Sequence, residues 1–298
     1  MRWKDGFEFE YGKVVPITPL VRGVVANNPS AYTGPGTTTF IIGRGDVAIL
    51  DPGPALPEHI AAVRRAVAGE RVTHLLVSHT HTDHSPATPG LQAFTGGVSC
   101  AFGPAPRQLP SEIDGAFDSA FQPDRLLRDG DVISGSNWTL TTVHTPGHAS
   151  GHLCFALAEE GILFAGDHVM GWSTSVIPPP DGDLLDYERS LRKLLTRIDR
   201  TYWSSHGAPI TDPPARVAEL LAVREKRAQQ VMGRLAAGDR TVAEITAQLY
   251  PAVGSELNFA ARAMVHAQLI ALLQQGKVSV DGPANADSVY RLRARSCN

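Results

Sequence analysis

The chain has 298 residues, of which 43% are apolar and 19% charged, a composition typical of a globular protein with a substantial core. Its formal net charge of −3 excludes a global basic field that would attract nucleic acid. Three widely separated cysteines, with no C-x-x-C pair, argue against a disulfide framework and favour a reduced, cytoplasmic compartment. The first residues lack the apolar core of a secretory signal, and no run reaches the ~18 apolar residues of a membrane span.

Segments rich in β-branched residues open the chain and predict three strands, at residues 20–25, 37–42 and 47–50. Asp51 follows the third strand, before a Pro-Gly turn, and two roles stay open for its carboxylate. It can cap the turn, or it can accept a hydrogen bond from a metal-bound histidine and so orient that ring. An amphipathic helix is predicted over 57–68 and a buried strand over 72–77, which together with the preceding strand indicate a βαβ unit.

The loop after the strand at 72–77 contains four metal-ligand residue types within six positions, in the spacing H-x-H-x-D-H: His79, His81, Asp83 and His84. Imidazole and carboxylate groups are ligands that zinc prefers. A solvated polar loop is the alternative. Lone histidines elsewhere, namely His59, His74 and His266, are assigned structural roles by default, but four such residues at this spacing favour a metal site. That interpretation predicts further ligands at later strand ends.

The rest of the first 212 residues continues the mixed pattern. A short helix is predicted within 86–94, a long loop over 103–125 and a helix over 183–199. Strands are predicted at 96–102, 126–127, 131–133, 138–144, 153–157 and 161–165. Three more candidate ligands follow apolar segments at glycine-containing turns, as expected for a metal site: His148, Asp167 and His206.

The motifs S-H-x-H-x-D-H, T-P-G-H, G-D and S-H-G, in this order, resemble those of the metallo-β-lactamase superfamily over about residues 15–212. The resemblance implies an α/β fold, a four-layer αβ/βα sandwich of two mixed sheets with helices outside and metals at one edge. It also implies that His79, His81 and His148 hold one metal. Asp83, His84 and His206 would hold a second, with Asp167 between the two.

The expected cofactors are therefore two zinc ions per chain, with iron or manganese as alternatives that suit the same ligands. The expected reaction is hydrolysis by a metal-activated hydroxide, in which Asp83 and Asp167 are the catalytic carboxylates and Asp83 accepts or relays a proton. We expect His168 and His152, which lie beside the candidate ligands in the sequence, to support the site or the fold rather than bind metal.

Residues 212–214 are predicted as a linker between a catalytic domain, 1–212, and a C-terminal domain, 213–298. Helices are predicted over 215–237, 241–250 and 255–275, and strands over 277–280 and 289–292. Three helices followed by a hairpin indicate a small winged-helix domain. The segments 166–173 and 102–104 also resemble the superfamily's subgroup that has a C-terminal winged helix and includes mitochondrial endoribonucleases.

The C-terminal domain has 11 lysines and arginines against 7 aspartates and glutamates. This excess is mild, and its third helix lacks a basic stripe, so we expect no DNA binding. Arg291, Arg293 and Arg295 are the best candidates for phosphate contacts. A role in packing or in homodimer formation is the alternative for this domain.

Three functions remain open. The first is a binuclear zinc hydrolase of an ester, thioester, lactone, amide or phosphodiester. The second is an endoribonuclease acting on single-stranded RNA, and the third is a di-iron redox enzyme. The residues that line the metal cleft should distinguish them, because basic residues there would favour RNA and apolar residues would favour small acyl substrates.

Overall fold

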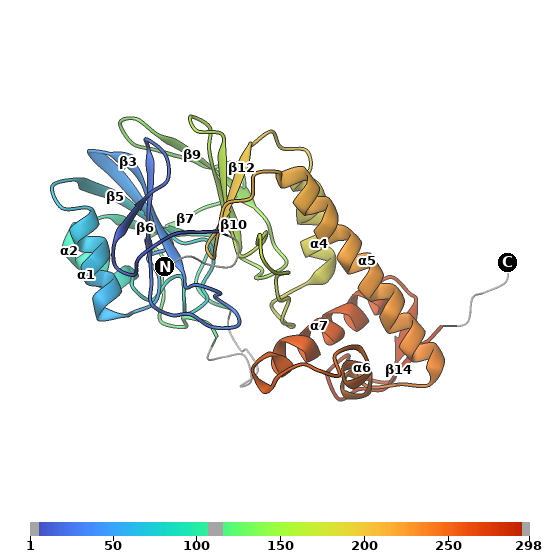
Figure 1. The fold of residues 1–298 in the computed structure, drawn as a ribbon. Helices are drawn as coiled ribbons and strands as arrows, with labels where there is room; N and C mark the ends of the chain where they lie inside the picture. The colour runs from blue at the N-terminus through green and yellow to red at the C-terminus, as the bar shows by residue number, and fades with distance from the viewer. Residues whose placement is uncertain (1–5, 107–115, 294–298) are drawn as a thin grey trace.

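Two β-sheets face each other in the computed structural model, which describes residues 6–106 and 116–293 (Figure 1). The first sheet has seven strands in chain order: β1 (Val14–Pro16), β2 (Val21–Val25), β3 (Thr38–Arg44), β4 (Asp46–Leu50), β5 (Arg71–Leu76), β6 (Val98–Ala101) and β7 (Arg125–Leu126). β1 to β4 pair antiparallel, whereas β4 to β7 pair parallel. Helices α1 (Pro57–Ala66) and α2 (Thr88–Thr95) make two of the crossovers that parallel strands require.

The second sheet has five strands: β8 (Val132–Ser134), β9 (Thr139–His144), β10 (Leu153–Leu157), β11 (Ile162–Gly166) and β12 (Thr201–Ser204). Their order is β12-β11-β10-β9-β8, and only β11 and β12 are parallel to each other. Helix α4 (Leu184–Leu194) connects that parallel pair, and the Asp183 side chain caps its first turn by accepting from Asp186 N.

Apolar side chains from both sheets form the central core. Phe40 of the first sheet and Phe164 of the second pack with ring centroids 4.9 Å apart, and both side chains are fully buried. The outer face of the first sheet packs on α1 and α2, and that of the second packs on α4 and the C-terminal helices. The predicted αβ/βα sandwich is therefore confirmed, with each sheet covered on both faces.

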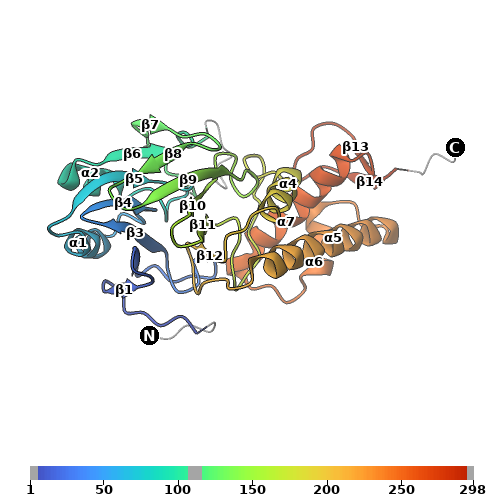
Figure 2. The ribbon, with the colours of Figure 1, turned by 90° about the horizontal axis from the view of Figure 1, so that it is seen from above.

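The C-terminal elements lie at one end of the molecule (Figure 2). They are α5 (Pro213–Ala237), α6 (Val242–Leu249), α7 (Ser255–Gln274), β13 (Val278–Val280) and β14 (Tyr290–Leu292). They have a core of their own around Ile245, Leu269 and Tyr290. However, Leu220 of α5 and Met264 of α7 belong to the core that covers the second sheet. The observed order is the predicted one, and the winged-helix assignment stays a prediction.

Several local predictions were wrong. Pro213 and Pro214 are not a linker but the first turn of α5, where a proline needs no N–H donor, and the Asp212 side chain caps this turn by accepting from Ala215 N. The helix predicted over 183–199 ends at Leu194. Strand β1 was not predicted, because it has three residues and ends in a proline. No helix in the described ranges is long and apolar enough to cross a membrane.

Candidate metal centre

The seven candidate ligands meet where the two sheets share an edge. The loop after β5 supplies four of them, and the other three follow β9, β11 and β12 of the second sheet. The two sheets are joined here, because Leu153 N donates to Ser78 O at 2.8 Å. Loops positioned by rigid strands are where metal and catalytic groups are commonly held.

The first group contains three histidines. His79 Nε2 lies 2.9 Å from His81 Nδ1, and His148 Nε2 lies 3.0 Å from the same atom. His148 Nδ1 donates to Val176 O at 2.6 Å, which leaves its Nε2 facing the other two rings. Three imidazole nitrogens converge on one point, a geometry that suits a cation accepting all three lone pairs.

The second group contains Asp83, His84 and His206. Asp83 Oδ2 lies 3.2 Å from His84 Nε2 and 3.4 Å from His206 Nε2. Asp167 lies between the two groups, since its Oδ2 is 3.6 Å from His84 Nε2 and 3.8 Å from His148 Nε2. Its other oxygen, Oδ1, is 3.2 Å from His206 Nε2. The structure thus brings all seven predicted residues together.

The two groups differ in protonation. Burial lowers the pKa of His79 well below its usual value and that of His81 to about 3, and neighbouring imidazoles act in the same direction. Burial also acts to lower the pKa of His84, but the carboxylates of Asp83 and Asp167 outweigh it and raise that pKa well above its usual value. The pKa values of both carboxylates are lowered despite burial, because imidazoles surround them.

The donor set fits divalent cations. His84 Nε2 and Asp167 Oδ1 are buried, yet neither makes a well-directed hydrogen bond with any residue in the described ranges. Buried polar atoms normally have a partner, so unsatisfied atoms in such a cluster indicate an absent one. A cation between the donors would satisfy both atoms, and neutral imidazole with carboxylate is a set that zinc accepts.

Hydrogen bonds on the far side of each ring orient the histidines. His84 Nδ1 lies 3.0 Å from Asp51 Oδ2, and His206 Nδ1 lies 3.2 Å from Gly36 O. His79 Nδ1 lies 3.0 Å from Ser78 Oγ. Such contacts fix the ring that faces a metal.

Asp51 is the centre of these supporting contacts. Its carboxylate accepts from Ser78 N at 2.7 Å, from Ser78 Oγ at 2.9 Å and from Ser205 Oγ at 2.9 Å, in addition to His84. Of the two roles left open by the sequence, this geometry matches the orienting acceptor. Asp51 is also the one non-glycine residue in the described ranges with positive φ, at 49°. Four buried hydrogen bonds offset that backbone strain.

Thr37 supports the second group, although no motif in the sequence predicts this role. Thr37 Oγ1 donates to Asp83 Oδ2 at 2.9 Å, and Asn28 Nδ2 donates to Thr37 Oγ1 at 3.0 Å. Ser205 and the carbonyls of Gly36 and Val176 were also missed. The only sequence signal was positional: Ser78 and Ser205 each stand immediately before a candidate ligand.

The histidines next to candidate ligands lie outside the ligand groups. His168 is buried with its ring 4.6 Å from the Tyr187 ring, and burial lowers its pKa to about 3. His152 Nε2 accepts from Asp167 N at 3.2 Å, and its Nδ1 lies 2.9 Å from Thr145 Oγ1. His152 thus contacts the backbone of a candidate ligand, whereas His168 contacts the helix behind it.

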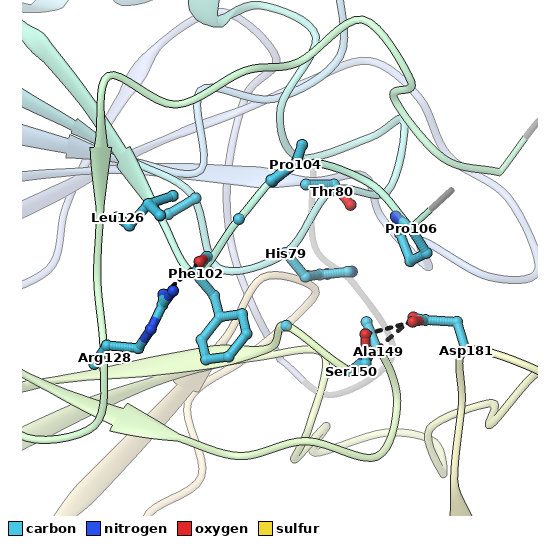
Figure 3. Close-up of a pocket in the computed structure, with 13 residues that line it drawn as sticks. His79, Thr80, Phe102, Pro104, Pro106, Leu126, Arg128, Ala149, Ser150 and Asp181 are labelled. Carbon is cyan, nitrogen blue, oxygen red and sulfur yellow. Dashed lines mark hydrogen bonds between the residues drawn. The ribbon is translucent and has the colours of Figure 1, made fainter. Parts of the chain in front are cut away.

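A cleft of about 320 Å³ opens beside His79 (Figure 3). Its described lining is mainly apolar and includes Phe102, Pro104 and Leu126. Arg128 is the one lysine or arginine among these lining residues, and its Nη1 donates to Phe102 O at 2.6 Å and to Leu127 O at 2.8 Å. At the opposite side, Asp181 accepts from Ser150 N and Oγ.

The arginines proposed to contact phosphate lie on or beside the C-terminal hairpin. Arg291 is exposed and forms an ion pair with Asp281, and Arg293 N donates to Lys277 O at 3.0 Å. Arg295 lies outside the described residues. β14 lies at the end of the molecule opposite β3 and β5 (Figure 1), so Arg291 and Arg293 do not join the metal cluster.

Comparison with known proteins identifies related chains. A family model described as the metallo-beta-lactamase superfamily matches residues 31–206. An atrochrysone carboxyl ACP thioesterase of Aspergillus chevalieri is 32% identical over 245 residues, which cover 78% of this chain and 73% of the relative. A lactamase-like protein of Emericella nidulans is 32% identical over 299 residues, covering 96% and 91%.

Solved structures match almost the whole chain. A beta-lactamase domain protein from Burkholderia ambifaria superposes with a TM-score of 0.80 at 19% identity, over 98% of this chain and 97% of its own. A metallo-beta-lactamase family protein from Thermus thermophilus gives a TM-score of 0.70 at 24% identity, over 94% and 97%. At these identities, the likeness establishes the fold of the chain, including the C-terminal elements.

Proposed function

Because the chain belongs to the metallo-beta-lactamase superfamily and is a metal-dependent hydrolase, we propose that it cleaves acyl thioesters at a pair of divalent cations. The observation that carries the proposal is the pair of donor groups joined by Asp167, beside a mainly apolar cleft. The thioesterase names of relatives at 30–32% identity support the choice of a thioester.

The residues of the site would have different roles in hydrolysis. When bound, two cations polarise a carbonyl and lower the pKa of a water to about 7. His79 and His81, whose pKa values burial lowers, present neutral nitrogens that would hold a cation without adding charge, and His148 Nε2 would complete the group. Asp83 is kept ionised, and Thr37 orients it, so it can take the proton that the attacking water releases. The water oxygen would bond to the acyl carbon, the C–S bond would break, and the leaving thiolate would take up the proton that Asp83 had accepted.

We propose zinc at both positions, because zinc prefers nitrogen donors with carboxylates. Iron and manganese are the alternatives that the same donors accommodate. Elemental analysis of protein purified without chelators should find about two zinc ions per chain and a colourless protein. Two iron ions with visible absorption would instead support the di-iron redox enzyme.

The cleft supports an acyl substrate rather than RNA. Its described lining has no cluster of lysines or arginines, and the single Arg128 is engaged by two backbone carbonyls. RNA-binding grooves need basic side chains along the phosphate path. The net positive charge of residues 213–298 favours an endoribonuclease as the second candidate, so RNA belongs in the same assay.

The test compares three substrates with zinc-loaded protein: an aromatic acyl thioester of N-acetylcysteamine, its oxygen ester, and single-stranded RNA. We expect thiol release from the thioester, abolished by a chelator and restored by zinc. RNA cleavage without thiol release, at low or high salt, would contradict the proposal and support the endoribonuclease.

A pair of variants tests whether the cleft holds the acyl group. Leu126 lines the cleft and is 51% exposed, whereas Val132 on β8 is 55% exposed and is not among the lining residues. Leu126→Arg should raise the KM for an apolar acyl thioester by about tenfold, since apolar pockets discriminate by roughly 10- to 200-fold. Val132→Arg should leave the KM unchanged, and equal effects would place the acyl group elsewhere.

A further inference from the structure

Residues 175–177 connect the metal centre to the C-terminal helices. Toward the centre, Ser175 Oγ donates to Asp167 O at 2.5 Å and to His168 O at 3.1 Å. One residue on, Val176 O accepts from His148 Nδ1 at 2.6 Å. This short segment therefore contacts one histidine of the first donor group and the backbone of the aspartate that lies between the groups.

The other side of the same segment is held by α5 and α7. Arg224 Nη2 of α5 donates to Ser175 O at 2.7 Å, and Ile177 N lies 3.2 Å from Met264 Sδ of α7. Two turns earlier on α5, Arg216 donates to Met170 O at 2.8 Å and to Ser173 O at 2.5 Å. Two arginines of one helix thus bind three carbonyls of the loop that begins at Asp167.

Arg224 is unusual in its surroundings. Its side chain is 3% exposed, and no carboxylate lies within ion-pair distance of it among the described residues. Its guanidinium stacks 5.1 Å from the Tyr187 ring centroid, and Tyr187 in turn donates its hydroxyl to His168 O at 3.0 Å. Burying an unpaired charge costs free energy, so the carbonyl and ring contacts of Arg224 must offset that cost. The carbonyl is that of Ser175, in the loop that follows Asp167, and the ring is that of Tyr187, on α4 behind this loop.

We propose that Arg224 is a positioning residue of the metal centre, which acts through Ser175 and Val176 to hold Asp167 and His148 at their places. The proposal rests on the assignment of those two residues as metal ligands. It goes beyond that assignment, because it gives the C-terminal helices a role in positioning the metal ligands. By thermodynamic reciprocity, bound metal then stabilises the packing of α5 against the loop.

The test is the metal affinity of Arg224→Met, which keeps the apolar length of the side chain and removes its donors. Chelator competition should show zinc affinity reduced by about 10- to 100-fold, the usual effect of removing a residue that supports a metal ligand. The cobalt-substituted variant should also have altered visible absorption bands, since the ligand geometry has changed. Arg234→Met is the matched control: Arg234 lies on the same helix and pairs with Asp239. It should bind metal as the unaltered protein does.

Milder variants keep the proposal testable if Arg224→Met does not fold. Arg224→Lys retains the charge without the planar fork, and Ser175→Ala removes only the hydroxyl that contacts Asp167 O. Both should fold, and each should bind zinc several-fold more weakly with shifted cobalt bands. Affinity and spectrum equal to those of the unaltered protein, in whichever Arg224 variant folds, would overturn the inference. If the unaltered protein itself bound no metal, the proposed function would fail instead.

Discussion

The two donor groups of the metal centre share one loop but differ in charge. His79 and His81 are neutral because burial and the neighbouring imidazoles disfavour their protonated forms and outweigh the opposing effect of the nearby carboxylates. Around Asp83, His84 and His206, carboxylates reverse it and raise the pKa values of both rings, which favours their protonated forms. The difference indicates two modes of binding: a cation enters the first group without displacing protons, whereas at the second it must displace them.

The largest expected effect comes from breaking the first group. His81→Ala removes one of three converging nitrogens, so the cation of that group and hydrolysis should be lost while the fold is kept. Because a metal supplies several kcal/mol of transition-state stabilisation, kcat/KM should fall by about a thousandfold or more. Steady-state kinetics with elemental analysis measures both effects.

His74→Ala is the control for that variant, because His74 lies on β5 and contacts Thr73 rather than the ligands. It should keep its metal and its activity. Full activity in His81→Ala, with circular dichroism unchanged in both variants, would refute the assignment of His81.

A smaller effect is expected from loosening the second group alone. Thr37→Val removes the hydroxyl that donates to Asp83 Oδ2 and keeps the size of the side chain. Affinity for the second cation should fall by about tenfold, and affinity for the first should not change. Titration with cobalt resolves the two binding steps by their absorption.

Thr39→Val makes the same substitution nearby, on β3, at a hydroxyl that lies 2.8 Å from His59 Nε2 instead of a candidate ligand. It should leave both binding steps unaltered. Equal weakening in the two variants would mean that Thr37 acts on the fold and not on Asp83.

The smallest expected signal is the release of protons when a cation binds. It directly tests the difference in protonation between the two donor groups. The carboxylates of Asp83 and Asp167 raise the pKa values of His84 and His206 and so favour protonation of these rings, which means that cation binding to the second group should release protons and weaken as the pH falls. His81, whose pKa is about 3, is already neutral and should release none at pH 7. Calorimetry in buffers of different ionisation enthalpy measures the number of protons released in each binding step. Equal release in both steps would contradict the proposed difference in protonation between the two groups.

The ligands could be predicted from the sequence because each follows an apolar strand, and strand ends meet at one edge. Their supports were harder to predict for a physical reason. His148 and His206 are oriented by the carbonyls of Val176 and Gly36, and every residue has a carbonyl, so no residue type marks the right ones. Asp51 was ambiguous because an aspartate before a Pro-Gly turn suits a cap as well as an acceptor.

Arg224 stands in a charged stretch, Arg-Glu-Lys-Arg, of the helix predicted over 215–237, yet it is buried. The spacing of Arg224 from the apolar residues of the same helix predicts that it is buried. Val217, Leu220, Val231 and Leu235 are also buried on α5, and Arg224 falls on the three- and four-residue period of that face. Chemical type suggested an exposed residue, whereas position in the helical period indicated a buried one.

The distribution of the site along the chain also sets an order for its assembly during synthesis. The residues that complete the first sheet end at Leu126, and the last candidate ligand, His206, arrives 80 residues later. Domains commonly form while the ribosome is still adding residues. A nascent chain that has just passed His206 contains all seven donors but has not yet received Arg224 or Met264. Such an intermediate should capture metal loosely, and retention should tighten only once α5 and α7 have packed against residues 175–177.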